Sequence, residues 1–394
     1  MKLVSSSVPI KRISPADQEM FFGYYDLNPY DATGKLHLAH RTAFADRLQV
    51  MGDKAELGFI ELATGSFEVV AETQAWNFQQ GAMLQWNPKK PSDEILFNSF
   101  DGKEFHGTCL NIKTGARRDY EMPFANVSKD GKWAISINFH RLYDFRPGYG
   151  YASVGDPFYW QKHSDKDGVF ITDLESGETK LVLSLQQIWD YSGAFFGGRD
   201  EKMIINHITF NPSATRFLAL VRNFPKKGER HDTLLLTANR DGSDLYMLSD
   251  YGVQSHYWWI DDTHVAFYND GKELACCRGW ANNYILEDKT HNGEIMADGF
   301  FVEDNHMSYS PTDPTKMITD TYWDAKDMRH LQLADFSKDI CWELGRFYSP
   351  HTDELVDIRC DLHPRWRFDG KVVSFDSIHE GYRGIYEADL SELV

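Results

Sequence analysis

RCDLHPRWRFDGKVVSFDSIHEGYRGIYEADL, residues 359–390, is the clearest β-meander in this chain. A short extended run at 365–368 leads into a turn at Asp369 and Gly370, and the apolar run KVVSFDS follows. After a polar connection comes a third run, GIYEADL. Runs of alternating apolar and polar residues between such turns predict antiparallel β-strands.

Six earlier segments repeat the first half of this stretch. They are YDLNPYDATGKLHLAHR, LQWNPKKPSDEILFNSF, ANVSKDGKWAISINF, ITFNPSATRFLALVRN, YWWIDDTHVAFYND and MSYSPTDPTKMITDTY. Repeats every 40–55 residues or so, with several strands in each, are typical of a β-propeller. The sequence therefore predicts an all-β fold, a single seven-bladed β-propeller that spans residues 1–394 as one domain. The strand-like run at 3–13 is expected to close the ring by supplying the outer strand of the last blade, the alternative being a disordered tail.

Four successive units carry a histidine just before the turn. His207, His256 and His306 each stand five residues before the turn residue, and His363 stands five or six before its own turn. Innermost strands line the central channel of a propeller, so equivalent positions in neighbouring blades converge. We expect these four side chains to lie near one another.

Composition narrows the choice of partners. Of 394 residues, 42% are hydrophobic, and the formal net charge is −18. That charge argues against nucleic acid as a partner, and no apolar run is long enough to span a membrane. The five cysteines form no disulfide pattern, and the N-terminus lacks an apolar signal segment, so a cytoplasmic location is expected. A periplasmic location is the alternative if the natural N-terminus is longer.

A long connection at about 140–168 interrupts the third unit, and connections of that length usually have a function. It carries Arg146, Tyr149 and Trp160, and arginines with aromatic residues suit a sugar ring and its carboxylate. The alternative is a lid that packs on its own aromatic residues. Arg41 and Gln80, in the first two units, are further candidates for substrate binding.

The ends of second strands provide a candidate catalytic cluster. Arg222 follows His207 by fifteen residues, and His140 follows the equivalent position of its own unit by the same number. Because a second strand runs antiparallel to the first, its end returns to the same face. His140, His207 and Arg222 are therefore expected to lie together.

The remaining histidines provide a candidate metal site. His256, His306 and His363 with the thiolate of Cys360 would make a nitrogen and sulfur ligand set suited to zinc. Asp361 is the alternative to Cys360, since it shares a strand face with His363. A hydrogen-bonded histidine cluster without metal is the other interpretation.

The units from His207 onward resemble the seven-bladed propeller polysaccharide lyases, both oligogalacturonate lyases and ulvan lyases. The resemblance rests on NHITFNP, LALVRN, SHYWWIDD, NHMSYSP and DLHPRW, and on FFGYYD in the N-terminal half. It implies the propeller fold, a uronate-containing oligosaccharide as substrate, and cleavage by β-elimination. This chain has Asp361 and His363 where the oligogalacturonate lyases have a His-Pro-His pair. Manganese and calcium are therefore alternatives to zinc as the bound metal.

A lyase removes the proton α to the uronate carboxylate, which requires a cation on the carboxylate, a base and an acid. Arg222 would bind the carboxylate, one of His140 and His207 would take the proton, and the other, or Tyr149, would protonate the leaving oxygen. Two other functions remain open. One is a glycoside hydrolase, similar to rhamnosidases that act on uronate-linked glycans, on the same scaffold. The other is a propeller that binds glycan or protein without catalysis.

Overall fold

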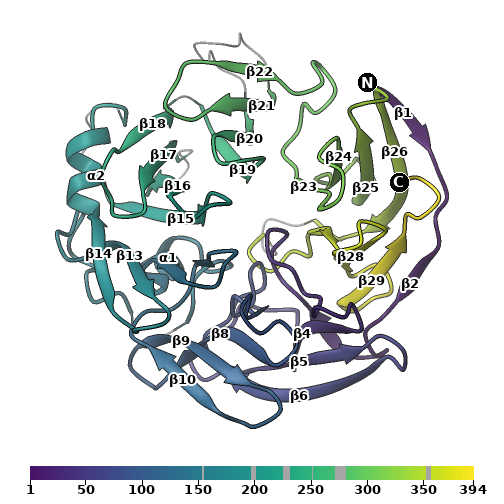
Figure 1. The fold of residues 1–394 in the computed structure, drawn as a ribbon, viewed down its shortest axis with the longest axis horizontal. Helices are drawn as coiled ribbons and strands as arrows, with labels where there is room; N and C mark the ends of the chain where they lie inside the picture. Colours follow the sequence, from purple (N-terminus) through teal and green to yellow (C-terminus); the bar gives the residue numbers. More distant parts are fainter. Residues whose placement is uncertain (153–154, 197–200, 225–230, 251, 271–280, 352–355) are drawn as a thin grey trace. The chain divides into compact units, whose positions relative to one another are not determined.

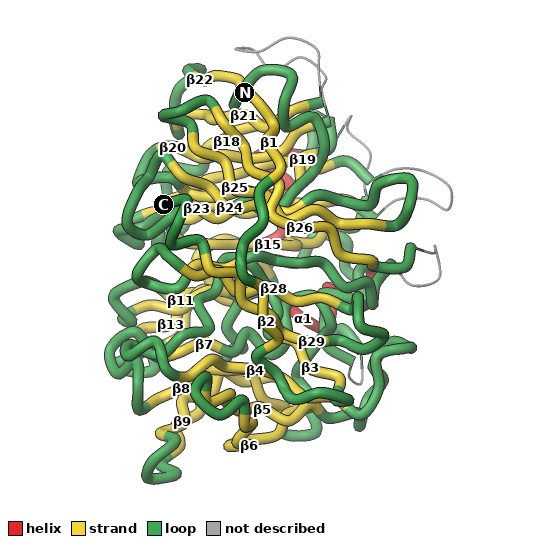
Figure 2. Tube along the Cα trace, turned by 90° about the vertical axis from the view of Figure 1, so that its right-hand side faces the viewer, coloured by secondary structure: helices red, strands yellow, loops and turns green. Residues whose placement is uncertain are grey.

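The computed structural model describes residues 1–152, 155–196, 201–224, 231–250, 252–270, 281–351 and 356–394. Nearly all of the regular structure is β-strand (Figure 2). The strands form seven sheets, each of four or five strands. These sheets are the blades of a seven-bladed β-propeller, as the repeats predict.

The chain divides into two compact units, which are described separately. Unit 1 contains residues 1–100, 109–118 and 305–394, and unit 2 contains residues 101–108 and 119–304. The strands of blade two are divided between the units. The prediction of one domain stays a prediction.

Unit 1 holds blades one, six and seven, part of blade two, and two N-terminal strands. The N-terminal strands are β1 (Lys2–Ser5) and β2 (Ile10–Arg12). Blade one has β3 (Glu19–Phe21), β4 (Leu36–Thr42), β5 (Ala55–Glu61) and β6 (Ser66–Thr73). Blade two has β7 (Gln85–Trp86), β8 (Glu94–Phe100), β9 (Phe105–Asn111) and β10 (Arg117–Tyr120). Blade six has β23 (Ser308–Tyr309), β24 (Lys316–Asp320), β25 (Met328–Asp335) and β26 (Ile340–Tyr348). Blade seven has β27 (Arg365–Trp366), β28 (Val372–Ser377) and β29 (Gly384–Asp389).

Unit 2 holds blades three to five and two short helices. Blade three has β11 (Asn126–Val127), β12 (Trp133–Ser136), β13 (Gly168–Asp173) and β14 (Thr179–Ser184). Blade four has β15 (Met203–Phe210), β16 (Arg216–Asn223), β17 (Thr233–Asn239) and β18 (Tyr246–Ser249). Blade five has β19 (Gln254–Trp259), β20 (His264–Asn269), β21 (Asn282–Glu287) and β22 (Gly293–Ile295). The helices are α1 (Phe139–Phe145) and α2 (Leu185–Ser192).

The N-terminal run supplies the outer strand of the last blade. β2 pairs antiparallel with β29, with Ile10 opposite Ala388, which confirms the predicted closing strand. β1 has a different role, because it pairs parallel with β26 as a fifth strand of blade six. In Figure 1 these two purple strands run beside β26 and β29. The chain ends are thus tied into two neighbouring sheets.

Apolar side chains from facing sheets fill each unit. In unit 1, Leu331 and Leu333 of blade six pack with Val373 and Phe375 of blade seven. In unit 2, a second buried cluster joins blades four and five through Leu218, Leu220, Tyr257, Val265 and Phe267. This packing follows from the apolar runs of the repeats, because each sheet buries both of its faces between neighbours.

The long connection after β12 begins with a helix. α1 starts at the expected loop boundary, where the Asn138 side chain caps it by accepting a hydrogen bond from the Arg141 backbone N–H. Residues 153–154 of this connection lie outside the described residues. Within the part of the chain that is described, no helix is long and apolar enough to cross a membrane.

Candidate functional site

Two of the predicted histidines meet in unit 1. His306 precedes β23 and His363 precedes β27, and their Nε2 atoms lie 3.2 Å apart. Asp361 completes a buried group whose ligand atoms all lie within 4.8 Å of one another. His363 has a positive φ of 43°, a backbone conformation that non-glycine residues adopt rarely and often at functional sites. We call His306, Asp361 and His363 the metal cluster.

The Nδ1 atoms of both histidines form hydrogen bonds, which turns their Nε2 atoms toward each other. His306 Nδ1 lies 2.8 Å from Asp320 Oδ1, and His363 Nδ1 lies 2.9 Å from the Gly23 carbonyl oxygen. Second partners of this kind fix the ring orientation of metal-binding histidines. Burial raises the pKa of Asp320 to about 6, so this carboxyl group is still mostly ionised at neutral pH.

The protonation states of the cluster suit a cation. Burial alone would raise the pKa of Asp361, but Arg329 and Arg359 hold it well below its usual range. Arg359 Nε lies 2.9 Å from Asp361 Oδ2, and Arg329 forms a second, fully buried ion pair with the same carboxylate. Burial lowers the pKa of His363 well below its ordinary value, and His306 lowers it further. An ionised carboxylate beside an unprotonated imidazole is competent to bind a divalent metal.

Cys360 is absent from the metal cluster within the described residues. Its side chain is buried, and its sulfur lies 4.0 Å from the Asp361 carbonyl oxygen. Burial raises the pKa of this thiol to about 12. Asp361 is thus the third member of the metal cluster, the place for which the sequence favoured Cys360. His256, which was also predicted as a ligand, belongs to unit 2.

Aromatic rings and a tight turn surround the metal cluster. The ring centroid of Tyr24 lies 5.0 Å from that of His363, and Tyr25 lies 5.3 Å from His306. The turn that contains Gln80 packs on the same segment, because a Cβ atom at Gly23 would lie 2.9 Å from the Gln80 carbonyl oxygen. The predicted binding residue Gln80 therefore lies beside the segment whose carbonyl orients His363.

The other predicted histidines meet in unit 2. The rings of Tyr149 and His207 are 5.3 Å apart, and those of His207 and His256 are 6.2 Å apart. Arg146 lies over Tyr149, with its Cζ 4.5 Å from the ring centre. His256 Nδ1 lies 2.9 Å from Asp304 Oδ1, which orients the imidazole ring. We call Tyr149, His207 and His256 the histidine cluster.

Arg222 is buried at the end of β16, close to both histidine-bearing strands. Its Nη1 donates to the Asn206 side chain at 3.5 Å, and its Nη2 donates to the Gln254 carbonyl at 3.4 Å. These partners stand one residue before His207 and two before His256. Both bonds are long for hydrogen bonds of a guanidinium group.

His140 lines a cleft that contains no residue of the histidine cluster. Its ring packs on Phe105 at 4.4 Å, and its Nε2 lies 3.7 Å from Glu104 Oε2. A cleft of about 480 Å³ has His140 and Trp160 in its lining. Burial lowers the pKa of His140, which favours its neutral form. The predicted residues His140 and Trp160 thus come together.

Arg41, the remaining predicted binding residue, is held by other groups of blade one. Its guanidinium pairs with Glu56 and donates to the Gln18 side chain at 3.2 Å. It also lies over the Phe67 ring. This partly exposed ion pair accounts for Arg41 without a ligand.

Several residues around the clusters were not predicted as site residues. Asp304 stands two residues before His306 in sequence, yet the histidine that it contacts is His256. Arg329 and Arg359 are visible in the sequence as ordinary charges. Only the folded structure shows that Arg329 of β25 meets Asp361, which lies in the segment before β27 of the next blade.

No protein-family model matches the chain, and no curated protein sequence does. Solved structures do, and they define the class as that of seven-bladed β-propellers. One is an oligogalacturonate lyase in complex with manganese, with 14% identity, a TM-score of 0.68, and 99% of this chain and 95% of that chain covered. Another is an oligogalacturonate lyase from Vibrio parahaemolyticus, with 15% identity, a TM-score of 0.63, and 97% and 93% covered. A tricorn protease matches with 9% identity, a TM-score of 0.50, and 96% of this chain but 36% of that chain covered. At these identities the likeness shows the fold.

Proposed function

We propose that this protein is a metal-dependent lyase that cleaves uronate-containing oligosaccharides by β-elimination. The observation that carries the proposal is the buried metal cluster, in which two inward-facing imidazole nitrogens share a site with an ionised carboxylate. Structures of the same fold that are described as oligogalacturonate lyases, one of them with manganese, support it.

The reaction breaks a C–H bond α to the uronate carboxylate and the C–O bond to the leaving sugar. The electron pair of the C–H bond forms the new carbon–carbon double bond, and the leaving oxygen gains a proton. A bound divalent metal would supply positive charge that stabilises the transition state. The protein must supply the base, the acid and further carboxylate binding.

Within unit 2, Arg222 and the histidine cluster have the side-chain types that these roles require. We assign carboxylate binding to Arg222, because a guanidinium group can make two parallel hydrogen bonds to a carboxylate. His207 takes the proton, and Tyr149, whose ring contacts His207, protonates the leaving oxygen. His256 with Asp304 is the alternative base, and His140 remains a candidate through its own cleft.

The identity of the metal is inferred from the types of ligand in the metal cluster. Two imidazoles suit zinc, and the carboxylate in place of the thiolate makes manganese equally suitable. Calcium fits less well, because it prefers an all-oxygen ligand set. Elemental analysis of protein purified without added metal should find about one equivalent, and His306→Ala should lose it. A folded wild-type protein with no metal after dialysis against zinc and manganese would overturn the metal proposal.

The activity is tested by screening uronate oligosaccharides for the ultraviolet absorbance of an alkene conjugated to a carboxylate. A chelator should abolish the signal, and added metal should restore it. New reducing ends without this absorbance would exclude a lyase.

Variants test the assigned roles. His207→Ala should lower kcat by about 10²–10⁴, the usual contribution of a positioned acid or base. Arg222→Lys should also lose activity, because a point charge cannot reproduce the two parallel bonds. His264→Ala, a half-exposed histidine of blade five, serves as the control and should leave kcat unchanged. Near-normal turnover of both His207→Ala and Arg222→Ala would contradict the assignment.

A glycoside hydrolase is the second candidate, and one observation favours it. Glu104 and Asp144 line the same cleft as His140 and Trp160, and burial raises the pKa of Asp144. Most glycosidases require a pair of carboxyl groups, one of them with a raised pKa. Hydrolysis would be lost in Asp144→Asn and kept in His306→Ala, the reverse of the lyase expectation.

A further inference from the structure

The cleft beside α1 has the size and lining of a ligand site. Its volume of about 480 Å³ lies within the range of roughly 300–1,000 Å³ that small-molecule pockets occupy. Its lining residues, all from unit 2, are Lys103, Glu104, His140, Asp144, Gly155, Asp156, Pro157, Tyr159 and Trp160. None of them belongs to the metal cluster or to the histidine cluster.

Trp160 presents an indole ring to solvent at the edge of this cleft. Its side chain is 92% exposed, more than any other large hydrophobic residue among the described ones. Tyr159 supports it edge-on, with ring centres 4.8 Å apart at 87°. The Lys202 ammonium lies 3.7 Å from the centre of the Tyr159 ring and holds that ring in turn. A large apolar ring held in water next to a cavity is typical of a stacking platform for a ligand.

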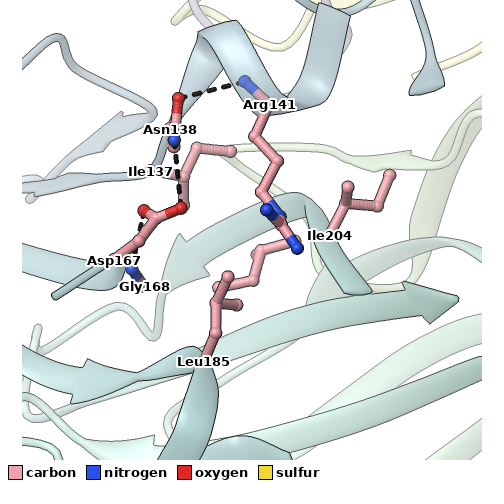
Figure 3. Close-up of a pocket in the computed structure, with 8 residues that line it drawn as sticks. Ile137, Asn138, Arg141, Asp167, Gly168, Leu185 and Ile204 are labelled. Carbon is pink, nitrogen blue, oxygen red and sulfur yellow. Dashed lines mark hydrogen bonds between the residues drawn. The ribbon is translucent and has the colours of Figure 1, made fainter. Parts of the chain in front are cut away.

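Buried polar contacts fix the segment that carries Trp160. Arg141 donates to Asp156 Oδ2 at 3.2 Å, and to the carbonyls of Gln161 at 3.2 Å and Lys162 at 2.8 Å. Asn138 donates to Asp156 Oδ1 at 2.9 Å. The segment is therefore tied to α1 on both sides of Trp160. Figure 3 shows Arg141 of α1 and its N-cap Asn138 at a second pocket, where Asn138 also meets Asp167.

The charges of the lining favour an uncharged ligand. Glu104 and Asp144 are acidic, and Asp156 is already neutralised by Arg141. Lys103 Nζ lies 3.9 Å from Glu104 Oε1, so a positive group and a negative group lie side by side in the lining. A ligand carboxylate would lie close to two carboxyl groups, and an ammonium group would lie close to Lys103. Hydroxyl groups, which both donate and accept, match carboxyl, ammonium and neutral imidazole groups together.

We propose that this cleft binds a neutral sugar ring. The ring stacks on the Trp160 indole, and its hydroxyl groups hydrogen-bond to Glu104, Asp144 and His140. The proposal does not rest on the lyase reaction, because none of these residues belongs to the metal cluster or the histidine cluster and the ligand is uncharged.

Titration calorimetry of the whole protein tests it, with cellotetraose and xylotetraose as neutral probes and trigalacturonate as the anionic one. At least one neutral probe should bind. Trp160→Ala should weaken that binding about tenfold or more, the scale on which truncating an aromatic anchor acts. Trp160→Phe should restore part of it, because a smaller aromatic face remains. Phe368→Ala, an aromatic residue of unit 1 with 49% exposure, is the matched control and should change nothing.

Three results would overturn the proposal: no neutral probe binds the wild type, Trp160→Ala binds as well as the wild type, or trigalacturonate binds this cleft more tightly than the neutral probes. His306→Ala separates this site from the proposed lyase. That variant should lose metal and β-elimination yet keep neutral binding, so either proposal can fail while the other stands.

Discussion

Asp361 shows how a single carboxylate can be kept ionised in a dry interior. Its side chain and that of Arg329 are both fully buried, and Arg359 supplies a second cation. Without them, burial would favour the neutral acid, which is a poor metal ligand. The two arginines therefore keep Asp361 in the ionised form that a metal ligand requires, although neither arginine belongs to the metal cluster.

Arg329→Met should destabilise the protein by about 3–5 kcal/mol, because it leaves part of a buried charge unpaired. Urea unfolding followed by circular dichroism would measure this. Arg346→Met is the control, since Arg346 is half exposed and pairs with Glu343 at 2.8 Å. Such a surface pair should contribute no more than about 1 kcal/mol. Equal effects of the two substitutions would contradict the role given to Arg329.

His306 and His363 could be predicted from sequence because the repeat places equivalent residues at equivalent points of neighbouring blades. The arginines could not, because Arg329 stands thirty-two residues before Asp361 and the two residues meet only through the packing of blade six against the segment that precedes β27. Cys360 was favoured over Asp361 because sulfur suits zinc. Its neighbour Asp361 is the residue whose side chain reaches both histidines.

At the scale of elements, α1 organises the connection after β12. The Asn138 side chain caps the helix and also donates to Asp156 and Asp167, so one residue joins the helix, the Trp160 segment and β13. The sequence predicted a loop here because the helix has seven residues and few strong helix formers. Its stability comes from these tertiary hydrogen bonds, which a local pattern does not reveal.

Asp167, which accepts a hydrogen bond from the α1 cap Asn138, should make the free energy of unfolding depend on pH. Burial raises the pKa of Asp167 to about 6, so the folded state holds its proton more tightly than the unfolded state does. Stability from this group is therefore present below about pH 4 and lost as the pH rises to about 6, by up to about 3 kcal/mol. Asp167→Asn removes the titration, so its stability relative to the wild type should rise across that window and then level off. Urea midpoints measured from pH 4 to 7 would show this.

Asp190→Asn, on the exposed side of α2, is the control and should keep the wild-type slope. Parallel curves for Asp167→Asn and the wild type would contradict the assignment, since burial of Asp167 would then have no effect on folding.

At the scale of the whole molecule, the seven repeats predicted the blades and the closing strand. Each blade shows its own alternation and turn, and the last one visibly lacked an outer strand. The parallel pairing of β1 with β26 was not predicted, because the strand is only four residues long and mostly exposed. Nothing in its pattern distinguishes a fifth strand from a tail.

The two N-terminal strands should therefore contribute unequally to stability. β2 completes a blade, and Ile10 packs against the core of blades six and seven. Its neighbours Lys11 and Arg12 form ion pairs with Glu387 and Glu380. β1 adds a strand to a blade that already has four.

Deleting residues 2–6 should cost little, while deleting residues 2–13 should cost at least about 2–5 kcal/mol, the range for losing a buried isoleucine side chain alone. If the chain is one domain, the longer deletion should also lower a single unfolding transition that tryptophan fluorescence and circular dichroism report together. Two separate transitions in the wild type would instead show two domains, and equal losses from the two deletions would contradict β2 as the closing strand.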